Sequence, residues 1–126
     1  MTLHGWSFCI ATIPGNELTL TQCIASIEKE FSEQNNCEII VVGANLKSSF
    51  NCSLPVRIIP FDEEVFSLSW RNIRIARKSR SLRRLFYRTG AISHKKNLAA
   101  REARFDKLCV MHDYVSLCPG WRKGLE

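Results

Sequence analysis

The sequence predicts an α/β fold in which a mostly parallel sheet is flanked by helices. Three observations carry this prediction. Short apolar runs with strand character alternate with segments of helical periodicity. The run CEIIVV, residues 37–42, is almost continuously apolar and rich in β-branched residues, which is typical of a strand buried on both faces. The connections between these segments are short, as in βαβ units.

The amino-terminal part predicts a strand followed by a helix. Residues 6–13 form an apolar run that ends at the breaker Pro14-Gly15-Asn16. From residue 18 to 31, apolar residues recur at helical spacing, and Asn16 or Thr19 is placed to cap that helix. The inward positions are Leu20, Cys23, Ile24, Ile27 and Phe31.

Three further elements complete the predicted order. Residues 56–59 form a short strand that Pro60 closes. Residues 92–104 form a helix with Leu98, Ala99 and Ala103 inward. Residues 107–111 form the last central strand, and Pro119-Gly120-Trp121 then turns the chain onward.

Composition limits the class of protein. The chain has 126 residues, 45% hydrophobic and 24% charged, which fits one globular domain. No apolar run approaches the length of a membrane span, and no signal peptide opens the chain. The six cysteines include no CxxC pair, and three lie inside apolar runs. We therefore expect free thiols in a reducing cytoplasm and no zinc site.

Positive charge is concentrated in one segment. Residues 65–101 hold eleven of the 18 Lys and Arg residues and no Asp or Glu. We interpret residues 65–90 as a basic insertion in a single domain spanning 1–126. Its densest part, residues 70–88, has three interpretations: a solvated helix over the sheet, a peripheral contact with an anionic membrane, or a nucleic-acid contact. The absence of a nucleic-acid motif argues against the third.

Polar residues gather where an α/β sheet binds ligands, beyond the carboxyl ends of its strands. The candidates after the first strand are Thr12, Pro14 and Asn16, and Asn45 follows the second. His112 and Asp113 follow the last strand, and Lys96 and Asn97 lie on the helix before it. The alternative interpretation is the ordinary polarity of strand ends in any such domain.

Several motifs in order resemble family 2 glycosyltransferases. They are SFCIATIP, the helix with CIASIEKE, CEIIVVG, and the later pair KKNLAAREA and KLCVMHDYVSLCPGW. The resemblance implies the nucleotide-sugar-binding half of a GT-A fold, which is Rossmann-like. It implies a nucleoside-diphosphate sugar as donor, a saccharide or lipid-linked acceptor, inversion of configuration, and Mn²⁺ or Mg²⁺ at the site.

The resemblance also implies residue roles, with alternatives. Asp113 falls in the metal motif, which suits a cation that prefers carboxylate oxygens and substrate phosphates. His112 is a second metal ligand, a phosphate contact, a support for Asp113, or a strand-end histidine with no metal role. Lys96 reaches the nucleotide or its phosphates, or is an exposed helix lysine. Asn97 makes a polar contact in the site or caps local backbone.

The sequence departs from the family at two places. Where a pair of Asp residues commonly follows the second strand, this chain has Gly43 and Ala44, so base recognition falls to Asn45 or to backbone groups. The metal motif reads His112-Asp113-Tyr114, with its only carboxylate in the middle.

The general base of the family lies well downstream of the metal motif. Only Glu126 offers a carboxylate after Asp113, so we expect the base beyond Glu126 and interpret the chain as a truncated donor half. Two function hypotheses follow. The first is a cytoplasmic glycosyltransferase donor domain, with a peripheral membrane contact through residues 70–88. The second is a non-catalytic basic module that binds anionic membrane or nucleic acid.

Overall fold

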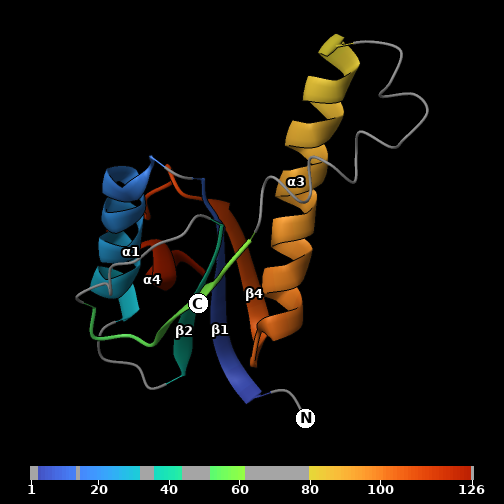
Figure 1. Ribbon diagram of the computed structural model, residues 1–126. Helices are drawn as coiled ribbons and strands as arrows, with labels where there is room; N and C mark the ends of the chain where they lie inside the picture. The colour runs from blue at the N-terminus through green and yellow to red at the C-terminus, as the bar shows by residue number, and fades with distance from the viewer. Residues whose placement is uncertain (1–2, 14, 32–35, 44–51, 62–79, 126) are drawn as a thin grey trace.

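The computed structural model describes residues 3–13, 15–31, 36–43, 52–61 and 80–125, and for residues 80–90 it describes the backbone alone. These residues form a parallel sheet flanked by helices on both faces, which confirms the predicted α/β class (Figure 1). The elements in chain order are β1 (Leu3–Ala11), α1 (Glu17–Phe31), β2 (Cys37–Val42), β3 (Val56–Ile59), α3 (Arg80–Glu102), β4 (Phe105–His112) and α4 (Trp121–Leu125).

The four described strands are all parallel, in the order β3-β2-β1-β4. The chain moves outward from β1 to β3 and then crosses back to place β4 on the other side of β1. Ala11 pairs with Val42 on one side and with His112 on the other, so three strands end in line. Ligands of such sheets bind at the carboxyl ends of the strands where the strand order reverses. Here that point lies between β1 and β4.

Helices cover both faces of the sheet, α1 and α4 on one and α3 on the other (Figure 1). The predicted apolar stripe of α1 is buried against its face of the sheet, as expected from its helical spacing. All six residues of β2 are buried, which confirms the interpretation of CEIIVV as a strand enclosed on both sides.

Helix α3 is longer than predicted. The predicted helix began at residue 92, whereas α3 begins at Arg80 and includes Gly90. The inward residues Ala91, Lys95 and Ala99 are four apart and buried, so they share one face. The two alanines allow the helix to approach the sheet closely.

Part of the basic segment belongs to this helix. Residues 80–88 form the start of α3, and residues 62–79 lie outside the described residues. The predicted insertion and its contacts with a membrane or nucleic acid stay predictions. No helix in the described residues is long and apolar enough to cross a membrane.

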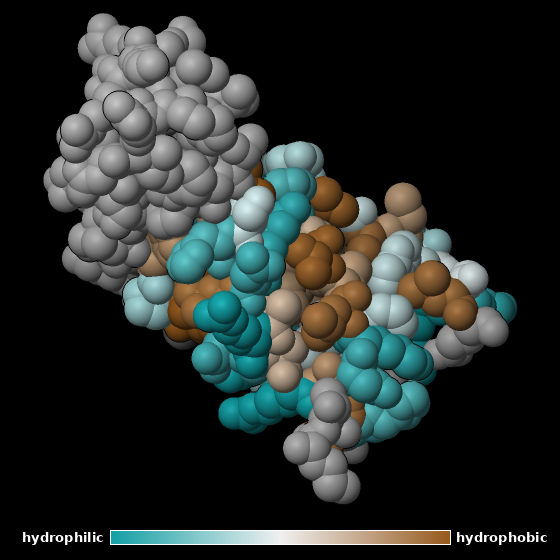
Figure 2. All heavy atoms as spheres, turned by 90° about the vertical axis from the view of Figure 1, so that its right-hand side faces the viewer, coloured by the Kyte–Doolittle hydropathy of each residue, from teal (hydrophilic) through white to brown (hydrophobic). Residues whose placement is uncertain are grey.

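Strand β4 lies at an edge of the described sheet, although the sequence predicts a central strand. Its residues Leu108 and Val110 are 46% and 45% exposed, whereas their partners on β1, Ser7 and Cys9, are buried. Helix α3 packs mainly on β1 and β2, which leaves this part of β4 uncovered by it. Figure 2 views the molecule from this side and shows apolar patches beside hydrophilic surface.

The segment after β4 returns to the core. Trp121 begins α4, and its ring centroid lies 5.6 Å from that of Trp6 and 6.0 Å from that of Phe31. Phe8 completes this aromatic cluster on the α1 face. The Pro119-Gly120-Trp121 turn therefore folds the chain back onto the described sheet.

A buried carboxylate joins the elements at the amino ends of the strands. Glu38 on β2 is 3% exposed, and its Oε1 accepts hydrogen bonds from Ser7 Oγ (2.8 Å) and Arg104 N (2.7 Å). Its Oε2 accepts a bond from Arg57 Nη2 on β3 (3.2 Å). This well-satisfied carboxylate ties three strands to the turn between α3 and β4.

The structure predicts that one thiol reacts much faster than the rest. All six cysteines are free, but burial raises the pKa of Cys9 to about 11 and the pKa of Cys23 and Cys37 to about 12. Burial also raises the pKa of Cys52 and Cys109. A raised pKa means less thiolate at neutral pH, and the thiolate is the reactive form.

Cys118 is exposed, so a disulfide reagent at pH 7.5 should label about one thiol quickly in the folded chain and all six in denaturant. Cys118→Ser should remove the fast phase. Rapid labelling of two or more thiols in the native protein would contradict the full or partial burial of the other five cysteines.

Candidate functional site

A buried polar cluster lies at the carboxyl ends of β1 and β4. Asp113 directly follows β4 and is 4% exposed, and Thr12 directly follows β1 and is 3% exposed. Asp113 Oδ2 accepts hydrogen bonds from Thr12 Oγ1 (2.8 Å) and from Asn16 Nδ2 (2.9 Å). The carboxylate therefore joins the ends of both strands to the start of α1.

Asn16 has two roles at the start of α1. Its main-chain oxygen accepts a hydrogen bond from Leu20 N (2.9 Å), as the residue that caps a helix does. Its side chain donates to Asp113 instead of capping the first turn. The sequence predicted that Asn16 or Thr19 caps this helix. In the structure the Asn16 side chain binds the Asp113 carboxylate of the polar cluster.

Lys95 is a part of the site that sequence reasoning missed. Its side chain is 1% exposed, and Nζ donates a hydrogen bond to the main-chain oxygen of Thr12 (2.9 Å). Nζ also lies 5.2 Å from the centre of the Phe61 ring, within the range of a cation–π contact. The spacing of Ala91, Lys95 and Ala99 could have identified Lys95 as the inward lysine of the pair.

Gly43 is required by the close approach of β1 and β2 at this end. Its φ is +122°, and a Cβ built on it would lie 2.0 Å from the main-chain oxygen of Thr12 and 3.4 Å from Nζ of Lys95. A Cβ at 2.0 Å from backbone oxygen cannot be accommodated without moving the strand. This explains why the chain has glycine at the first position after β2.

Lys96 reaches the same end of β4 from its own side of α3. Its Nζ lies 3.4 Å from His112 Nε2, and since an ammonium can only donate, the ring nitrogen accepts. The His112 ring stacks on the ring of Tyr114, with centroids 5.2 Å apart and planes 4° apart. Tyr114 is 70% exposed, so this pair forms an accessible aromatic rim.

A cavity of about 150 Å³ opens beside the cluster. Thr12, Asn16, Lys95, His112 and Asp113 line it together with apolar side chains. Complete pockets for small molecules commonly measure about 300–1,000 Å³. The cavity formed by the described residues therefore fits one portion of a ligand, such as a phosphate group or a sugar ring.

The structure brings together most of the predicted site residues. Thr12, Asn16, His112 and Asp113 line the cavity, and Lys96 joins them through His112. Asn97 is exposed and is not among the residues that line this cavity. The predicted candidates Pro14 and Asn45 lie outside the described residues.

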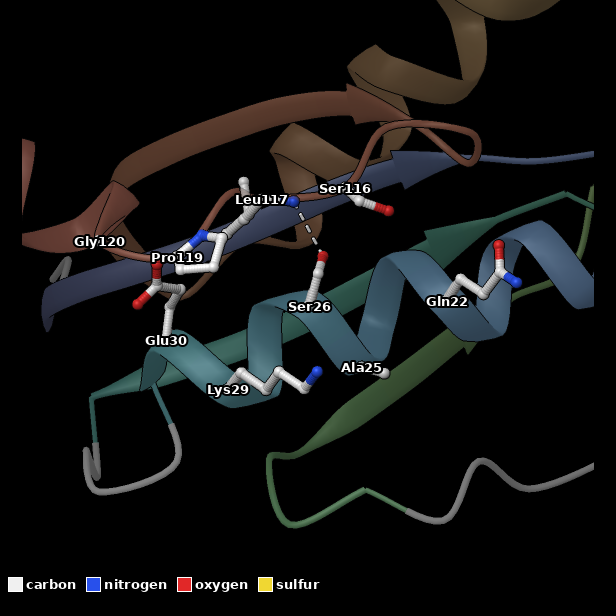
Figure 3. Close-up of a pocket in the computed structure, with 9 residues that line it drawn as sticks. All are labelled: Gln22, Ala25, Ser26, Lys29, Glu30, Ser116, Leu117, Pro119 and Gly120. Atoms are coloured by element: carbon white, nitrogen blue, oxygen red, sulfur yellow. Dashed lines mark hydrogen bonds between the residues drawn. The ribbon is translucent and has the colours of Figure 1, made fainter.

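A larger pocket, of about 480 Å³, lies between α1 and the segment after β4 (Figure 3). Its polar groups already hold these two segments together. Ser26 Oγ accepts a hydrogen bond from Leu117 N (3.0 Å), and Glu30 Oε1 accepts one from Trp121 N (2.7 Å). We therefore regard this pocket as a packing seam and the smaller cavity as the functional candidate.

The side chains at the site do not fit a divalent cation well. Within the described residues, no group of three or more His, Cys, Asp or Glu side chains could hold a metal ion. Oδ2 of Asp113 already accepts two hydrogen bonds, and Nε2 of His112 faces the Lys96 ammonium. Mn²⁺ or Mg²⁺ at Asp113 and His112, as the resemblance implies, stays a prediction that this donor set does not favour.

Comparison of the chain with protein-family models, with curated proteins and with solved structures finds no match. The fold and the geometry of the site therefore rest on the chain's own residues. The resemblance to family 2 glycosyltransferases stays a prediction.

The contact between Gly43 and Thr12 can be tested by adding one methyl group. Gly43→Ala should lower the free energy of unfolding by about 3 kcal/mol, because it combines backbone strain with a clash. Gly120→Ala is the matched control, since Gly120 has a φ of +85° but open space around its Cβ position. It should cost only about 1 kcal/mol, from strain alone. Equal losses in urea denaturation would contradict the close approach at Gly43.

Proposed function

We propose that this chain binds a nucleoside-diphosphate sugar between the ends of β1 and β4 and acts as the donor-binding part of a glycosyltransferase. The observation that carries the proposal is the buried carboxylate of Asp113, which lies beside a cavity that the Lys95 side chain also lines. Lys96 adds a second ammonium nearby through His112. A carboxylate and ammonium groups at the reversal of strand order suit a ligand that has both hydroxyls and phosphates.

The two kinds of group match two parts of a sugar nucleotide. A carboxylate accepts hydrogen bonds from hydroxyl groups but repels phosphate, so we assign Asp113 to a hydroxyl of the ribose or of the donor sugar. Ammonium groups attract phosphate, so we assign Lys95 and Lys96 to the diphosphate. Thr12 and Asn16 hold the carboxylate in one orientation through their hydrogen bonds to Oδ2.

The same arrangement suits the chemistry of glycosyl transfer. Transfer breaks the bond between the anomeric carbon and the diphosphate oxygen, and the electron pair leaves with the diphosphate. Fixed positive groups close to the departing oxygens stabilise the transition state if their positions are set in advance. The Lys95 ammonium is fixed in this way, because it is buried and bound to the Thr12 carbonyl.

The proposed transfer also needs an acceptor with a reactive hydroxyl group. An acceptor hydroxyl needs a base to take its proton. Asp113 is engaged with Thr12 and Asn16, so we assign no general base here. A saccharide or lipid-linked acceptor, and a peripheral membrane contact through residues 70–88, remain part of the proposal. All six thiols are free, which supports a reducing compartment such as the cytoplasm.

Binding of sugar nucleotides tests this function directly. Uridine, guanosine and thymidine diphosphate sugars should be titrated in a melting scan, and at least one should raise the melting temperature, because it binds the native state alone. Asp113→Asn keeps an oxygen for Thr12 and Asn16 but loses the charge. A hydrogen bond to a charged group contributes about 1.5–3 kcal/mol, so this variant should bind the sugar nucleotide about tenfold or more weakly.

Asp106→Asn is the matched control, because Asp106 lies near the amino end of the same strand, where it bonds His4 and Gly5. It should leave sugar-nucleotide binding within about twofold of the unmodified chain. No stabilisation by any sugar nucleotide, or equal losses in the two variants, would contradict the proposed function.

A further inference from the structure

Two large apolar side chains lie at the exposed rim of the cavity. Asp113 and Thr12 are buried, whereas Ile13 and Tyr114, which line the same cavity, are 48% and 70% exposed. A single exposed apolar side chain is ordinary on a protein surface, but two at one cavity are the kind of wall that small-molecule sites have. The rim therefore suits the less polar part of a ligand whose hydroxyl groups reach Asp113.

A turn and a ring contact hold Tyr114 in place. The main-chain nitrogen of Val115 donates a hydrogen bond to the main-chain oxygen of His112 (3.2 Å), which closes a four-residue turn with Asp113 and Tyr114 at its centre. The Tyr114 ring lies almost parallel to the His112 ring, at 4°, with the centroids 5.2 Å apart, as in an offset stack. An exposed ring that is held in advance loses little freedom when a ligand binds to it.

The nucleobase is the part of a sugar nucleotide that best matches this ring. Aromatic side chains stack on nucleobases, because every base has a flat π-face. The donor sugar is not flat, and hydroxyl groups surround its ring, so it suits the carboxylate of Asp113 better than the face of Tyr114.

The order of the residues also matches the order of the groups in a nucleotide. Asp113 and Tyr114 are consecutive in the chain, and in a nucleotide the ribose is bonded directly to the base. The cavity of about 150 Å³ has room for a sugar ring but is smaller than a complete small-molecule pocket. A ribose in the cavity, with its hydroxyl groups at Asp113, therefore places the base at the rim.

We propose that Tyr114, supported by the His112 ring, stacks on the nucleobase of the sugar nucleotide, with Ile13 as a second apolar contact, while Asp113 binds the ribose hydroxyl groups. The inference rests on the proposed function for the identity of the ligand as a sugar nucleotide. Stacking uses the face of the base rather than its edge, so this contact contributes affinity without selecting one base.

Uridine diphosphate and guanosine diphosphate are direct probes of this contact, because each has the base and the ribose but no donor sugar. At least one should bind the full chain in a calorimetric titration. Tyr114→Ala should weaken that binding about tenfold or more, whereas Tyr114→Phe, which keeps the ring, should stay within twofold. Val115→Ala is the matched control, because Val115 belongs to the same turn and is 36% exposed but does not line the cavity, and it should also stay within twofold.

A nuclear Overhauser effect between the ring protons of Tyr114 and the protons of the bound base should show the contact itself. Loss of affinity in Tyr114→Ala for the sugar nucleotide but not for either diphosphate would place the donor sugar on the ring and overturn the proposal. Equal losses in Tyr114→Phe and Tyr114→Ala would also overturn it, because they would assign the contact to the phenol hydroxyl.

The outcome is separable from that of the proposed function. Sugar-nucleotide binding that Tyr114→Ala leaves within twofold would overturn the base contact and leave the donor-binding function standing. Binding of a nucleoside diphosphate that depends on Tyr114, without stabilisation by any sugar nucleotide, would do the reverse. Absence of binding by every nucleotide would overturn both.

Discussion

The carboxylate of Asp113 is the constraint on which the functional end of the structure depends. Burial of a charged carboxylate is strongly unfavourable unless hydrogen bonds replace its hydration. Thr12 and Asn16 supply those bonds, and they come from the end of β1 and the start of α1. One buried group thus fixes the relative positions of three elements that meet beside the cavity.

The two ends of the sheet show how similar groups serve different purposes. Glu38, near the amino ends, is also buried, but it contacts Arg57, Ser7 and the main chain, so its acceptors are used within the fold. Asp113 lies beside an open cavity and next to lysines that keep contacts of their own. The first arrangement holds strands together, and the second holds strands together and also places charged groups beside a cavity.

Much of this arrangement was predictable because it follows from periodicity. The apolar stripe of α1 and the apolar run of β2 were enough to predict that these two elements are buried in the core. Because β1 and β4 are parallel, Thr12 and Asp113 then lie at the same edge of the sheet. Lysine is usually assigned to an outward face, so Lys95 was overlooked despite its spacing from Ala91 and Ala99.

The other features that the sequence did not predict have a common cause. Helix α3 begins twelve residues before the predicted start at residue 92, and the edge position of β4 depends on strand order rather than on its own residues. The tight approach at Gly43 is likewise a contact between distant segments. None of these follows from local pattern, because each depends on tertiary packing.

We propose that the small cavity at Asp113, rather than the larger pocket between α1 and the segment after β4, receives the sugar nucleotide. Amide chemical shifts measured by NMR during titration with the most stabilising sugar nucleotide distinguish the two cavities. The largest shifts should occur at Thr12, Asn16, Lys96 and Asp113. Shifts concentrated at Ser26, Glu30 and Leu117 would contradict it.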